Sequence, residues 1–384
     1  MPDRIQIEKI GKLGFGYMRL PVKGGAYDTE QINRMADAFL GNGGTYFDAA
    51  FIYEGAEEAL RDTVVKRYPG DRGKIQIATK LSLHAAKSLE DMKKHFQISL
   101  DRLGTDYIDF YLLHGLDAAS SGKGEELGAW EYLKELKSKG LIRHIGFSFH
   151  GTPEDLDEIF SKHPEAEFVQ PQINYLDWDG QRVQARRLHE VTRKYDIPIV
   201  AMEPLRGGLL ASADSPITSL LRAANPGASP ASWALRFVAQ LEGVIVTLSG
   251  MSSLDQVTDN VATFADLKPL SSDEMALLDK AVEIINSVPR IDCTSCRYCV
   301  KECPSNIAIP NMIGVYNDYL AYKTTAGINR PYWLFTRNAG KAGDCTACKA
   351  CEEICTQKLE IAELMKVISG VFDNPGEQPG VPPL

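Results

Sequence analysis

Residues 75–114 read IQIATKLSLHAAKSLEDMKKHFQISLDRLGTDYIDFYLLH, which is two β-rich runs around one amphipathic run. The β-rich runs predict strands over Ile75–Lys80 and Tyr107–His114. Between them, apolar residues recur at steps of three and four, the spacing of one buried helix face. That helix is predicted over Ser88–Leu103, with its buried face formed by Leu89, Met92, Phe96, Leu100 and Leu103. A strand, a helix and a strand in this order predict a βαβ unit with parallel strands.

The same alternation of short strands and longer helices continues through residues 1–270. Further strands are predicted over Leu13–Met18, Tyr46–Ala49, Ile142–Ser148, Phe168–Gln172, Ile197–Met202 and Val244–Leu248. Further helices are predicted over Thr29–Leu40, Glu126–Ser138, Thr152–Phe160, Gln181–Tyr195, Pro230–Gln240 and Leu254–Phe264. About eight strands that alternate with helices predict an α/β fold of the (β/α)8 TIM-barrel class. A doubly wound open sheet would begin with a glycine-rich turn into a helix, and no helix follows Gly14 and Gly16 directly.

All eight cysteines fall in two runs near the end of the chain. Each run has the spacing C-x2-C-x2-C-x3-C, and they consist of Cys293, Cys296, Cys299 and Cys303, then Cys345, Cys348, Cys351 and Cys355. This spacing is typical of a ferredoxin-like domain that binds two [4Fe–4S] clusters. Zinc is the alternative for thiolate ligands, but its sites usually combine two separated C-x2-C pairs. Disulfides are disfavoured because a disulfide-bonded protein usually spreads its cysteines through the fold.

In ferredoxins of this spacing, the first three cysteines of a run bind one cluster and the fourth binds the other. The first predicted ligand set is therefore Cys293, Cys296, Cys299 and Cys355. The second is Cys345, Cys348, Cys351 and Cys303. Pro304 follows the first run as in the common pattern, whereas Thr356 follows the second. This difference changes a local turn and leaves the ligands in place.

The chain divides by sequence into three parts. Residues 1–288 are predicted to form the barrel, including a further helix over 271–288. Residues 289–365 are predicted to form the ferredoxin-like domain, and its aromatic-rich insertion, 304–344, is either a lid or a surface for a partner. The tail, 366–384, is rich in proline and glycine towards its end and is predicted to be disordered.

Composition narrows the class of protein. The net charge is −9 with no cluster of basic residues, which disfavours nucleic acid and anionic membranes as partners. The start of the chain lacks the pattern of a signal peptide, and no apolar run approaches the length of a membrane span. Residues 1–292 contain no cysteine, which favours a reducing compartment. We therefore expect a cytoplasmic protein.

Four polar residues stand at or just after the ends of predicted strands: Asp48, Tyr53, Lys80 and His114. Because the carboxyl ends of the strands of a TIM barrel meet at the active site, these side chains are expected to lie close together. Each one alone has an ordinary structural explanation. A single aspartate is often a cap, a tyrosine packs, a lysine is solvated and a histidine is a satisfied polar group. The four in this order form a sharper pattern.

With these motifs, the chain resembles the aldo-keto reductase family over residues 6–265. The matching stretches are GFGYMRLP at 14–21, FDAAFIY at 47–53, ATK at 78–80, DFYLLHG at 109–115, GFS at 146–148, QINY at 172–175 and GMSS at 250–253, followed by Asn260. The cysteine-rich addition resembles the iron–sulfur branch of that family. The resemblance implies that Asp48, Tyr53, Lys80 and His114 form a catalytic tetrad in an oxidoreductase.

The chemistry of a carbonyl reduction suits these four residue types. The oxygen that develops negative charge must gain a proton, and a phenol can donate one, although its usual pKa is about 10. The Lys80 ammonium would lower the pKa of Tyr53, and Asp48 would hold Lys80 in place. His114 could donate a hydrogen bond to the carbonyl oxygen. Tyr53 is then the general acid in reduction and the general base in oxidation.

The resemblance also implies a nicotinamide cofactor, NADP or NAD, on the same face. The implied contact residues are Gly16, Tyr17 and Met18 beside the nicotinamide, Ser148 and Gln172 at its carboxamide, Leu205 and Gly207 near the pyrophosphate, and Gly250, Ser252, Gln256 and Asn260 at the adenosine end. The glycines have turn formation as their alternative explanation. Gly250 stands near the place where many relatives carry a basic residue for the 2′-phosphate, so the sequence leaves NADP and NAD both open.

The predicted function is NAD(P)-linked reduction of a small-molecule carbonyl, or the reverse oxidation of an alcohol, coupled to electron transfer through two [4Fe–4S] clusters. Nicotinamide moves two electrons as a hydride, whereas a cluster moves one. A flavin, bound here or on a redox-protein partner, could join the two. One alternative is therefore a ferredoxin- or flavin-linked reductase that uses no soluble nicotinamide. The other is a redox sensor or electron carrier without catalysis.

Overall fold

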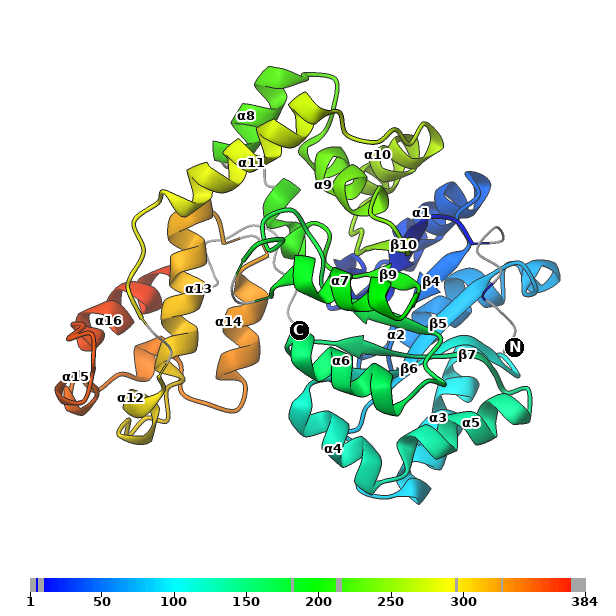
Figure 1. The fold of residues 1–384 in the computed structure, drawn as a ribbon, viewed down its shortest axis with the longest axis horizontal. Coiled ribbons are helices and arrows are strands. Elements are labelled where there is room, and N and C mark those ends of the chain that lie inside the picture. Colours follow the sequence, from blue (N-terminus) through cyan, green and yellow to red (C-terminus); the bar gives the residue numbers. More distant parts are fainter. Residues whose placement is uncertain are drawn as a thin grey trace. The chain divides into compact units, whose positions relative to one another are not determined.

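The structure is a computed structural model, and it describes Ile5 and residues 10–180, 183–211, 216–293, 296–325 and 327–373. The chain folds into two compact units (Figure 1). The first consists of Met1–Leu205 and Ala231–Leu270, and the second of Arg206–Pro230 and Ser271–Leu384. Each unit is built from two separate stretches of sequence, and each is described by itself.

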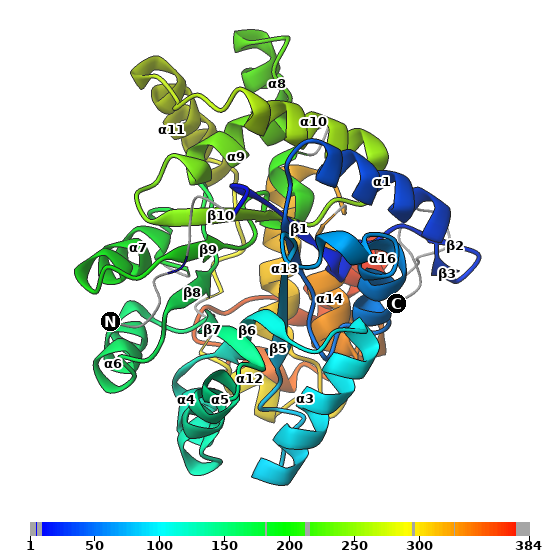
Figure 2. The ribbon, with the colours of Figure 1, turned by 90° about the vertical axis from the view of Figure 1, so that its right-hand side faces the viewer.

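The first unit is a closed barrel of eight parallel strands, which confirms the predicted fold class (Figure 2). The strands are β1 (Leu13–Gly16), β4 (Tyr46–Asp48), β5 (Gln76–Leu81), β6 (Ile108–Leu116), β7 (Ile142–Phe149), β8 (Phe168–Pro171), β9 (Ile199–Ala201) and β10 (Val244–Ser249). Around the ring they follow the order β1-β10-β9-β8-β7-β6-β5-β4, and β4 closes against β1. All eight strands fall where the sequence predicted them. Strands buried on both faces are nearly continuous apolar runs, which is why they could be found.

Helices of the first unit surround the strands (Figure 2). They are α1 (Thr29–Gly41), α2 (Ala56–Leu60), α3 (Leu89–Leu103), α4 (Ala118–Glu126), α5 (Ala129–Ser138), α6 (Pro153–Lys162), α7 (Ala185–Lys194), α9 (Pro230–Ala239) and α10 (Leu254–Ala265). A short hairpin, β2 (Val22–Lys23) with β3 (Ala26–Tyr27), precedes α1. The predicted helix over Gln181–Tyr195 begins later, at Ala185, and residues 181–182 lie outside the described residues.

Two helix predictions need correction. The helix expected over Glu126–Ser138 begins later, at Ala129, because Gly128 adopts the left-handed conformation with φ of 66°, and the preceding helix α4, Ala118–Glu126, was not predicted. In α3, Met92, Phe96, Leu100 and Leu103 are buried as predicted, but Leu89 is 41% exposed. Leu89 is the first residue of the helix, so it precedes the part of the helix that packs on the barrel.

Aromatic and aliphatic side chains fill the inside of the barrel below the strand ends. Phe110 packs edge-on against Tyr46 and Phe168, with ring centroids 5.1 and 5.0 Å apart. Ala78, Val200 and Val246 belong to the same buried cluster. The carboxyl ends of the strands lie beyond this apolar plug, and a (β/α)8 barrel places its chemistry there.

Near the start of β6, a buried carboxylate ties neighbouring segments together. Asp109 is fully buried, and one of its oxygens, Oδ2, accepts hydrogen bonds from Arg72 Nη1 at 2.8 Å and from the Ile77 backbone N–H at 3.0 Å. Its other oxygen, Oδ1, pairs with Arg143 at 3.0 Å. Both guanidinium groups also stack on the Tyr107 ring, at 3.9 and 4.3 Å from its centroid. This network lies at the amino-terminal end of the strands and is structural.

The second unit is helical. It contains α8 (Pro216–Ala224), α11 (Ser272–Asn286), α12 (Tyr298–Lys301), α13 (Ile309–Tyr322), α14 (Asn329–Thr336), α15 (Ala350–Glu353) and α16 (Ile361–Phe372), with 3-10 turns over Arg206–Ala211 and Ala342–Asp344. Helix α8 packs against α11, α13 packs against α16, and α12 lies beside α15 (Figure 1). Within the described residues, no helix combines the length and the apolar character needed to cross a membrane.

Two stretches are grouped differently from the predicted domain limits. Residues 206–230 and 271–288 belong to the second unit, whereas the sequence analysis placed them in the barrel. Residues 366–372, expected in the disordered tail, are helical because Met365, Ile368 and Phe372 continue the buried face of α16. Residues 374–384, the rest of the predicted tail, lie outside the described residues.

Candidate active site and cysteine cavities

Asp48 and Lys80 form a buried ion pair at the ends of two neighbouring strands. In the register of β4 and β5, Asp48 lies opposite Ala78, and Lys80 follows on the same face two residues later. Lys80 Nζ donates hydrogen bonds to Asp48 Oδ1 at 2.5 Å and to the Ala49 carbonyl oxygen at 2.7 Å. The two side chains are 1% and 4% exposed. A buried ammonium at this place is stable only because both partners are present.

Tyr53 lies in the loop after β4 and brings its ring to this pair. Lys80 Nζ is 5.3 Å from the centroid of the Tyr53 ring. On the other side, the Tyr53 ring meets the His114 ring edge-on, with centroids 5.6 Å apart. The structure therefore brings together all four residues of the predicted tetrad, from β4, the β4–α2 loop, β5 and β6.

The His114 imidazole is partly buried, and its surroundings disfavour the positively charged form. Burial lowers its pKa to about 3, and the positive charge of Lys80 contributes in the same direction. Smaller contributions come from His150 and His84, which follow β7 and β5. Its Nδ1 is buried and has no hydrogen-bond partner among the described residues. A neutral imidazole in this position can donate one hydrogen bond to a carbonyl oxygen without carrying charge.

The sequence analysis missed Gln170. This residue of β8 is 1% exposed, and its Nε2 donates a hydrogen bond to Asp48 Oδ2 at 2.9 Å. The only local signal was an amide side chain in the otherwise apolar strand FVQP. Glu57 was missed as well, although it is fully buried. Its carboxylate accepts a hydrogen bond from Thr79 Oγ1 at 2.7 Å and pairs with Arg102 at 3.4 Å, which links α2 to the strand that carries Lys80.

The two residues expected at the nicotinamide carboxamide each have an internal partner. Ser148, in β7, is 1% exposed and its Oγ accepts a hydrogen bond from the Gly115 N–H at 2.7 Å. Gln172 follows β8, and its Nε2 donates to Asp177 Oδ2 at 3.1 Å. The residue directly opposite Ser148 in the register is Gln170, not Gln172. Gln170 and Gln172 therefore have different partners, Asp48 and Asp177.

Hydrogen bonds connect the residues expected to bind the adenosine part of the cofactor, at the end of β10 and in α10. Asn260 is 2% exposed and donates a hydrogen bond to Ser249 Oγ at 3.0 Å. The Ser252 backbone N–H donates a hydrogen bond to Gln256 Oε1 at 2.7 Å, and the Ser252 hydroxyl donates one to the Arg19 carbonyl oxygen at 2.6 Å. Gly250 leaves room for the Arg19 side chain, whose Cδ stands 3.3 Å from where a Cβ would lie. A basic side chain thus reaches this end from the β1 loop.

The remaining expected contacts are distributed as follows. Gly16 ends β1 directly opposite Asp48 in the register, which places it at the site. Tyr17 is fully buried and its hydroxyl lies 3.0 Å from Thr63 Oγ1, so its ring belongs to the core. Met18 is half-buried, and Leu205 ends the first part of the first unit. Gly207 has a φ of 70° and belongs to the second unit.

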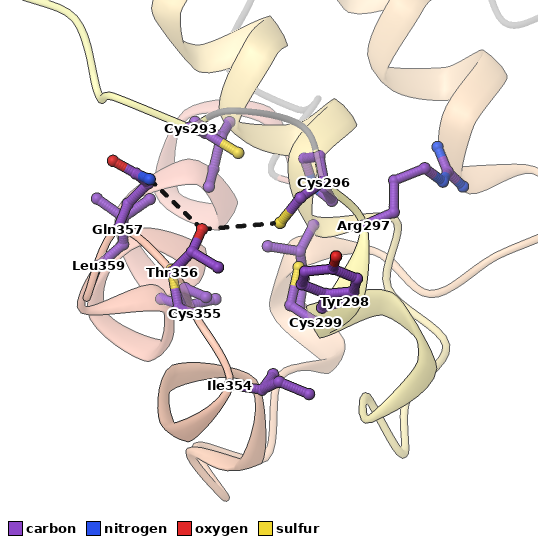
Figure 3. A pocket seen from close by; sticks show the side chains of 14 residues that line it. Cys293, Cys296, Arg297, Tyr298, Cys299, Ile354, Cys355, Thr356, Gln357 and Leu359 are labelled. Carbon is purple, nitrogen blue, oxygen red and sulfur yellow. Dashed lines mark hydrogen bonds between the residues drawn. The ribbon is translucent and has the colours of Figure 1, made fainter.

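In the second unit, the eight cysteines surround two cavities. Cys293, Cys296, Cys299 and Cys355 line the first (Figure 3). Cys303, Cys345, Cys348 and Cys351 line the second. Each cavity thus receives three thiols from one run and the fourth from the other run. Apolar side chains complete the walls, among them Ile309 and Ile361, which contact both cavities.

The two runs adopt the same backbone turns. Arg297 and Lys349 occupy the same place in the two runs, two residues before the third cysteine. Their φ values are 64° and 63°. Each precedes a single-turn helix, α12 or α15. Further along, Asn306 and Lys358 have φ values of 52° and 53°. Left-handed residues let the chain fold tightly around a central object, so the turns suit a compact cluster.

The donor set fits an iron–sulfur cluster better than a single ion. Burial raises the pKa of the Cys299 and Cys351 thiols to about 11, and neighbouring sulfurs add to the effect. Thiols crowded in this way favour a cationic metal centre that binds them as thiolates. In the described part of the chain, however, no three Cys, His, Asp or Glu side chains converge closely enough to hold one metal ion. A zinc site would need such convergence, with sulfurs about 2.3 Å from the ion.

The parallel barrel thus carries a buried Lys–Asp pair, a tyrosine and a histidine together at the ends of its strands. Residues 12–283 match the model of the aldo/keto reductase family, and the chain belongs to that family. Residues 292–359 match the model of the 4Fe-4S dicluster domain. The predicted family and its iron–sulfur branch are thereby confirmed.

Similar proteins come from several sources. An aldo-keto reductase of Mycolicibacterium vanbaalenii is 30% identical over 243 residues, which cover 63% of this chain and 80% of that protein. The L-galactose dehydrogenase of Arabidopsis thaliana is 25% identical over 70% of this chain and 89% of its own length. Among solved structures, an aldo-keto reductase of Klebsiella pneumoniae in complex with NADPH matches with a TM-score of 0.56 and 25% identity, over 71% of this chain and 90% of that one. The holo form of an aldo-keto reductase from Bacillus halodurans matches with a TM-score of 0.57 and 27% identity, over 70% and 91%.

Proposed function

We propose that this protein reduces a small-molecule carbonyl, or oxidises the corresponding alcohol, with a nicotinamide cofactor and with Tyr53 as general acid and base. The observation that carries the proposal is the placement of Lys80, which lies 2.5 Å from Asp48 and 5.3 Å from the Tyr53 ring centroid. A phenol next to a fixed ammonium gives up its proton more readily than a free phenol. Tyr53 can then exchange a proton with a substrate oxygen near neutral pH.

The roles of the side chains follow from one balanced reaction. A reduced nicotinamide held at the strand ends would supply the hydride for the carbonyl carbon. As the oxygen gains the electron pair of the broken π bond, the Tyr53 hydroxyl protonates it, and Tyr53 later regains a proton from solvent. His114, uncharged because its pKa is about 3, holds the oxygen by a hydrogen bond. In the reverse direction, Tyr53 removes the proton of the alcohol.

Residues at the strand ends would hold the cofactor. Gly16 and Met18 would lie beside the nicotinamide, and Ser148 and Gln172 would hold its carboxamide. Gly250, Ser252, Gln256 and Asn260 would hold the adenosine end, with Leu205 near the pyrophosphate. NADPH is bound in the similar Klebsiella pneumoniae structure, which supports a nicotinamide here. The Arg19 side chain beside Gly250 supports NADP over NAD, because a cation can pair with a 2′-phosphate.

We further propose that each cysteine cavity holds one [4Fe–4S] cluster. The ligands of the first are Cys293, Cys296, Cys299 and Cys355, and those of the second are Cys303, Cys345, Cys348 and Cys351. Such clusters supply one-electron transfer, whereas a hydride carries two electrons. Coupling the two requires two successive single-electron steps, through a flavin on this chain or on a redox-protein partner, or through a substrate radical. A reducing compartment such as the cytoplasm suits these free thiols.

Two other functions are distinguished by experiment. A ferredoxin- or flavin-linked reductase would reduce substrate with electrons from the clusters and would need no soluble nicotinamide. A redox sensor would bind cofactor without turnover, and the complete tetrad is an observation against it. The two cysteine cavities in the same chain favour the ferredoxin- or flavin-linked reductase as the second candidate function.

The deciding experiment compares wild-type protein with Tyr53→Phe, both purified without oxygen. We expect the variant to lose about 100-fold or more of its carbonyl reduction, with nicotinamide binding unchanged in a fluorescence titration. Tyr107→Phe is the matched control, because Tyr107 stacks between Arg72 and Arg143 at the opposite end of the strands. Unchanged activity in Tyr53→Phe would contradict the proposal.

A second experiment tests the clusters. The protein is reduced with dithionite, excess reductant is removed, and carbonyl substrate is added with and without a nicotinamide. Oxidation of the clusters during turnover, followed by their absorption and electron paramagnetic resonance, is the expected result. Clusters that stay reduced through many turnovers would show that they do not take part in the reaction. Turnover without nicotinamide would favour the ferredoxin- or flavin-linked reductase.

A further inference from the structure

One position distinguishes the two cysteine runs beside their cavities. The fourth cysteine of the first run is followed by Pro304, and that of the second run by Thr356. Pro304 lines the second cavity, and Thr356 lines the first (Figure 3). A proline has neither a hydroxyl nor a backbone N–H, so it donates no hydrogen bond. The first cavity therefore has a donor at a position whose counterpart in the second cavity can donate nothing.

The Thr356 hydroxyl faces a cysteine of the other run. Its Oγ1 lies 4.0 Å from Cys296 Sγ, and Cys296 is one of the four thiols of the first cavity. Either atom of this pair could be the donor while the cysteine is a thiol. A cysteine that binds a metal centre is a thiolate without a proton. With a cluster bound, the Thr356 hydroxyl is therefore the donor and Cys296 Sγ the acceptor.

The amide of Gln357 favours the same direction of donation. Gln357 Nε2 donates a hydrogen bond to Thr356 Oγ1 at 3.4 Å. This bond uses a lone pair of the hydroxyl oxygen and leaves its hydrogen for another acceptor. Figure 3 shows the two hydrogen bonds in series, from Gln357 through Thr356 to Cys296. Because hydrogen bonds in a chain polarise one another, the amide strengthens the donation from the hydroxyl to the sulfur.

The hydroxyl nearest to Pro304 in the sequence has a different acceptor. Ser305 lines the second cavity, but its Oγ donates a hydrogen bond to the Asp344 carbonyl oxygen at 2.7 Å. A threonine directly after the first cysteine is common to both runs, as Thr294 and Thr346, so it does not distinguish them. The position after the fourth cysteine is thus the one at which a hydroxyl is present in one run and absent from the other.

A difference in charge acts in the same direction as the hydroxyl. Glu302, directly before the fourth cysteine of the first run, lines the second cavity. The matching residue of the second run is Ile354, which lines the first cavity. A carboxylate repels an electron added nearby, although water screens this repulsion because Glu302 is exposed. Both differences make a cluster in the first cavity the easier one to reduce.

We propose that the Thr356 hydroxyl raises the reduction potential of the cluster in the first cavity above that of the cluster in the second. The inference rests on the proposed [4Fe–4S] clusters. A hydrogen bond to a ligating sulfur stabilises the reduced form, which carries the additional negative charge. One electron then passes from the reduced second cluster, which becomes oxidised, to the oxidised first cluster, which becomes reduced, and no proton moves. A single electron in this domain therefore resides on the first cluster.

The test is a potentiometric titration of the full-length protein, purified without oxygen and reduced with dithionite. Electron paramagnetic resonance and visible absorption follow the clusters, and wild-type protein should be reduced in two steps. Thr356→Val keeps the shape of the side chain and removes the hydroxyl, so the step at the higher potential should fall while the other stays.

The expected size of the shift is modest, because Thr356 is exposed and water competes for the same sulfur. We expect the ratio of reduced to oxidised first cluster at a fixed potential to drop about three-fold or more in Thr356→Val. For a one-electron couple, in which 59 mV corresponds to a tenfold change, this is about 30 mV.

Two further variants separate the hydroxyl from the shape of the side chain. Thr356→Ser keeps the hydroxyl and should keep the wild-type potentials. Ser305→Ala is the matched control in the other cavity, and it should move neither step because the Ser305 hydroxyl binds a backbone carbonyl. The proposal is overturned if both steps are unchanged in Thr356→Val, if only the lower step moves, or if Thr356→Ser shifts as much as Thr356→Val. Should Thr356→Val not retain iron, Thr356→Ala gives the same readout.

Iron and sulfide are measured on the same samples so that two failures remain distinct. Wild-type protein that contains no iron would show that the proposed clusters are wrong. Two clusters in each chain, with potentials that do not respond to the Thr356 variants, would leave the clusters in place and refute the role of Thr356.

Discussion

Lys80 donates one hydrogen bond to the Asp48 carboxylate and another to the carbonyl of the next residue, Ala49. An ammonium has three N–H donors, so two of the three are used on a single strand end. The ammonium is held at a fixed place 5.3 Å from the Tyr53 ring centroid, instead of sampling many rotamers as an exposed lysine does. This fixed charge is the central feature of the site.

Replacing Lys80 by Met should remove this charge while filling a similar volume. We expect kcat/KM to fall about 1,000-fold, because Tyr53 loses the group that makes it acidic. The variant should also lose about 3 kcal/mol of stability, since Asp48 is left buried without its ion partner. Steady-state kinetics and thermal unfolding measure the two effects. Lys74→Met is the control, because that lysine is 79% exposed and pairs with Asp71 on the surface, and it should change neither quantity.

His114 should make the folded protein less stable in acid. Its folded pKa is about 3, whereas an unfolded histidine titrates near pH 6.5. Between these values, the unfolded chain binds a proton that the folded chain does not. Stability therefore rises with pH up to about 6.5, by at most about 1.4 kcal/mol per unit for this residue.

The measurement for His114 is urea unfolding at about pH 5 and about pH 7, on wild-type protein and on His114→Gln. The variant should show the smaller difference in unfolding free energy between the two pH values, since it cannot take up the proton. The comparison isolates His114 from other histidines whose pKa is also lowered by burial, such as His150 and His189. An identical pH dependence in both proteins would contradict the neutral state of His114.

The crossed arrangement of the cysteines predicts which variants resemble one another. Cys355→Ser should lose the same cluster as Cys293→Ser, because both residues line the first cavity. Cys303→Ser should instead match Cys348→Ser, which lines the second. Iron and sulfide content and the electron paramagnetic resonance of the reduced protein identify the lost cluster. If Cys355→Ser matches Cys348→Ser, each run serves its own cluster and the crossed assignment is wrong.

The buried carboxylate at the other end of the barrel should affect stability alone. In Asp109→Asn, the guanidinium groups of Arg72 and Arg143 lose their charged partner, which we expect to cost about 3 kcal/mol. The kcat of the folded variant should be unchanged, because the network lies at the amino-terminal ends of the strands. Denaturant unfolding and steady-state kinetics check the two statements, and a large fall in kcat would show that this end of the barrel influences the site.

The tetrad could be predicted because each of its residues is marked by the stretch of sequence around it. Asp48, Lys80 and His114 each end or follow a recognisable apolar strand, and the barrel rule brings such ends together. The strands themselves were recognisable because a parallel sheet is buried on both faces. The cysteine runs are similar, since their spacing alone predicts which thiols share a cavity, and the structure groups them in that way.

Gln170 could not be found in the same manner. It is 122 residues away from Asp48 in sequence, and the two meet only because the barrel closes and places β8 opposite β4. No window of sequence contains both residues. The break between α4 and α5 is a different case, because Gly128 was visible in the sequence and its left-handed conformation was overlooked. The grouping of residues 206–230 with the second unit depends on packing, which a pattern of strands and helices does not reveal.

The cavity that contains the first cysteine of the chain also contains the last. Cys293 and Cys355 line the same cavity, whereas the last of the four thiols that line the second cavity is Cys351. On the ribosome, the thiols of the earlier run must therefore wait for the final one to be translated. A protein that ends just before Cys355 would keep all four thiols of the second cavity and lose one thiol of the first. The position of Cys355 in the sequence therefore decides which set of four thiols is completed last.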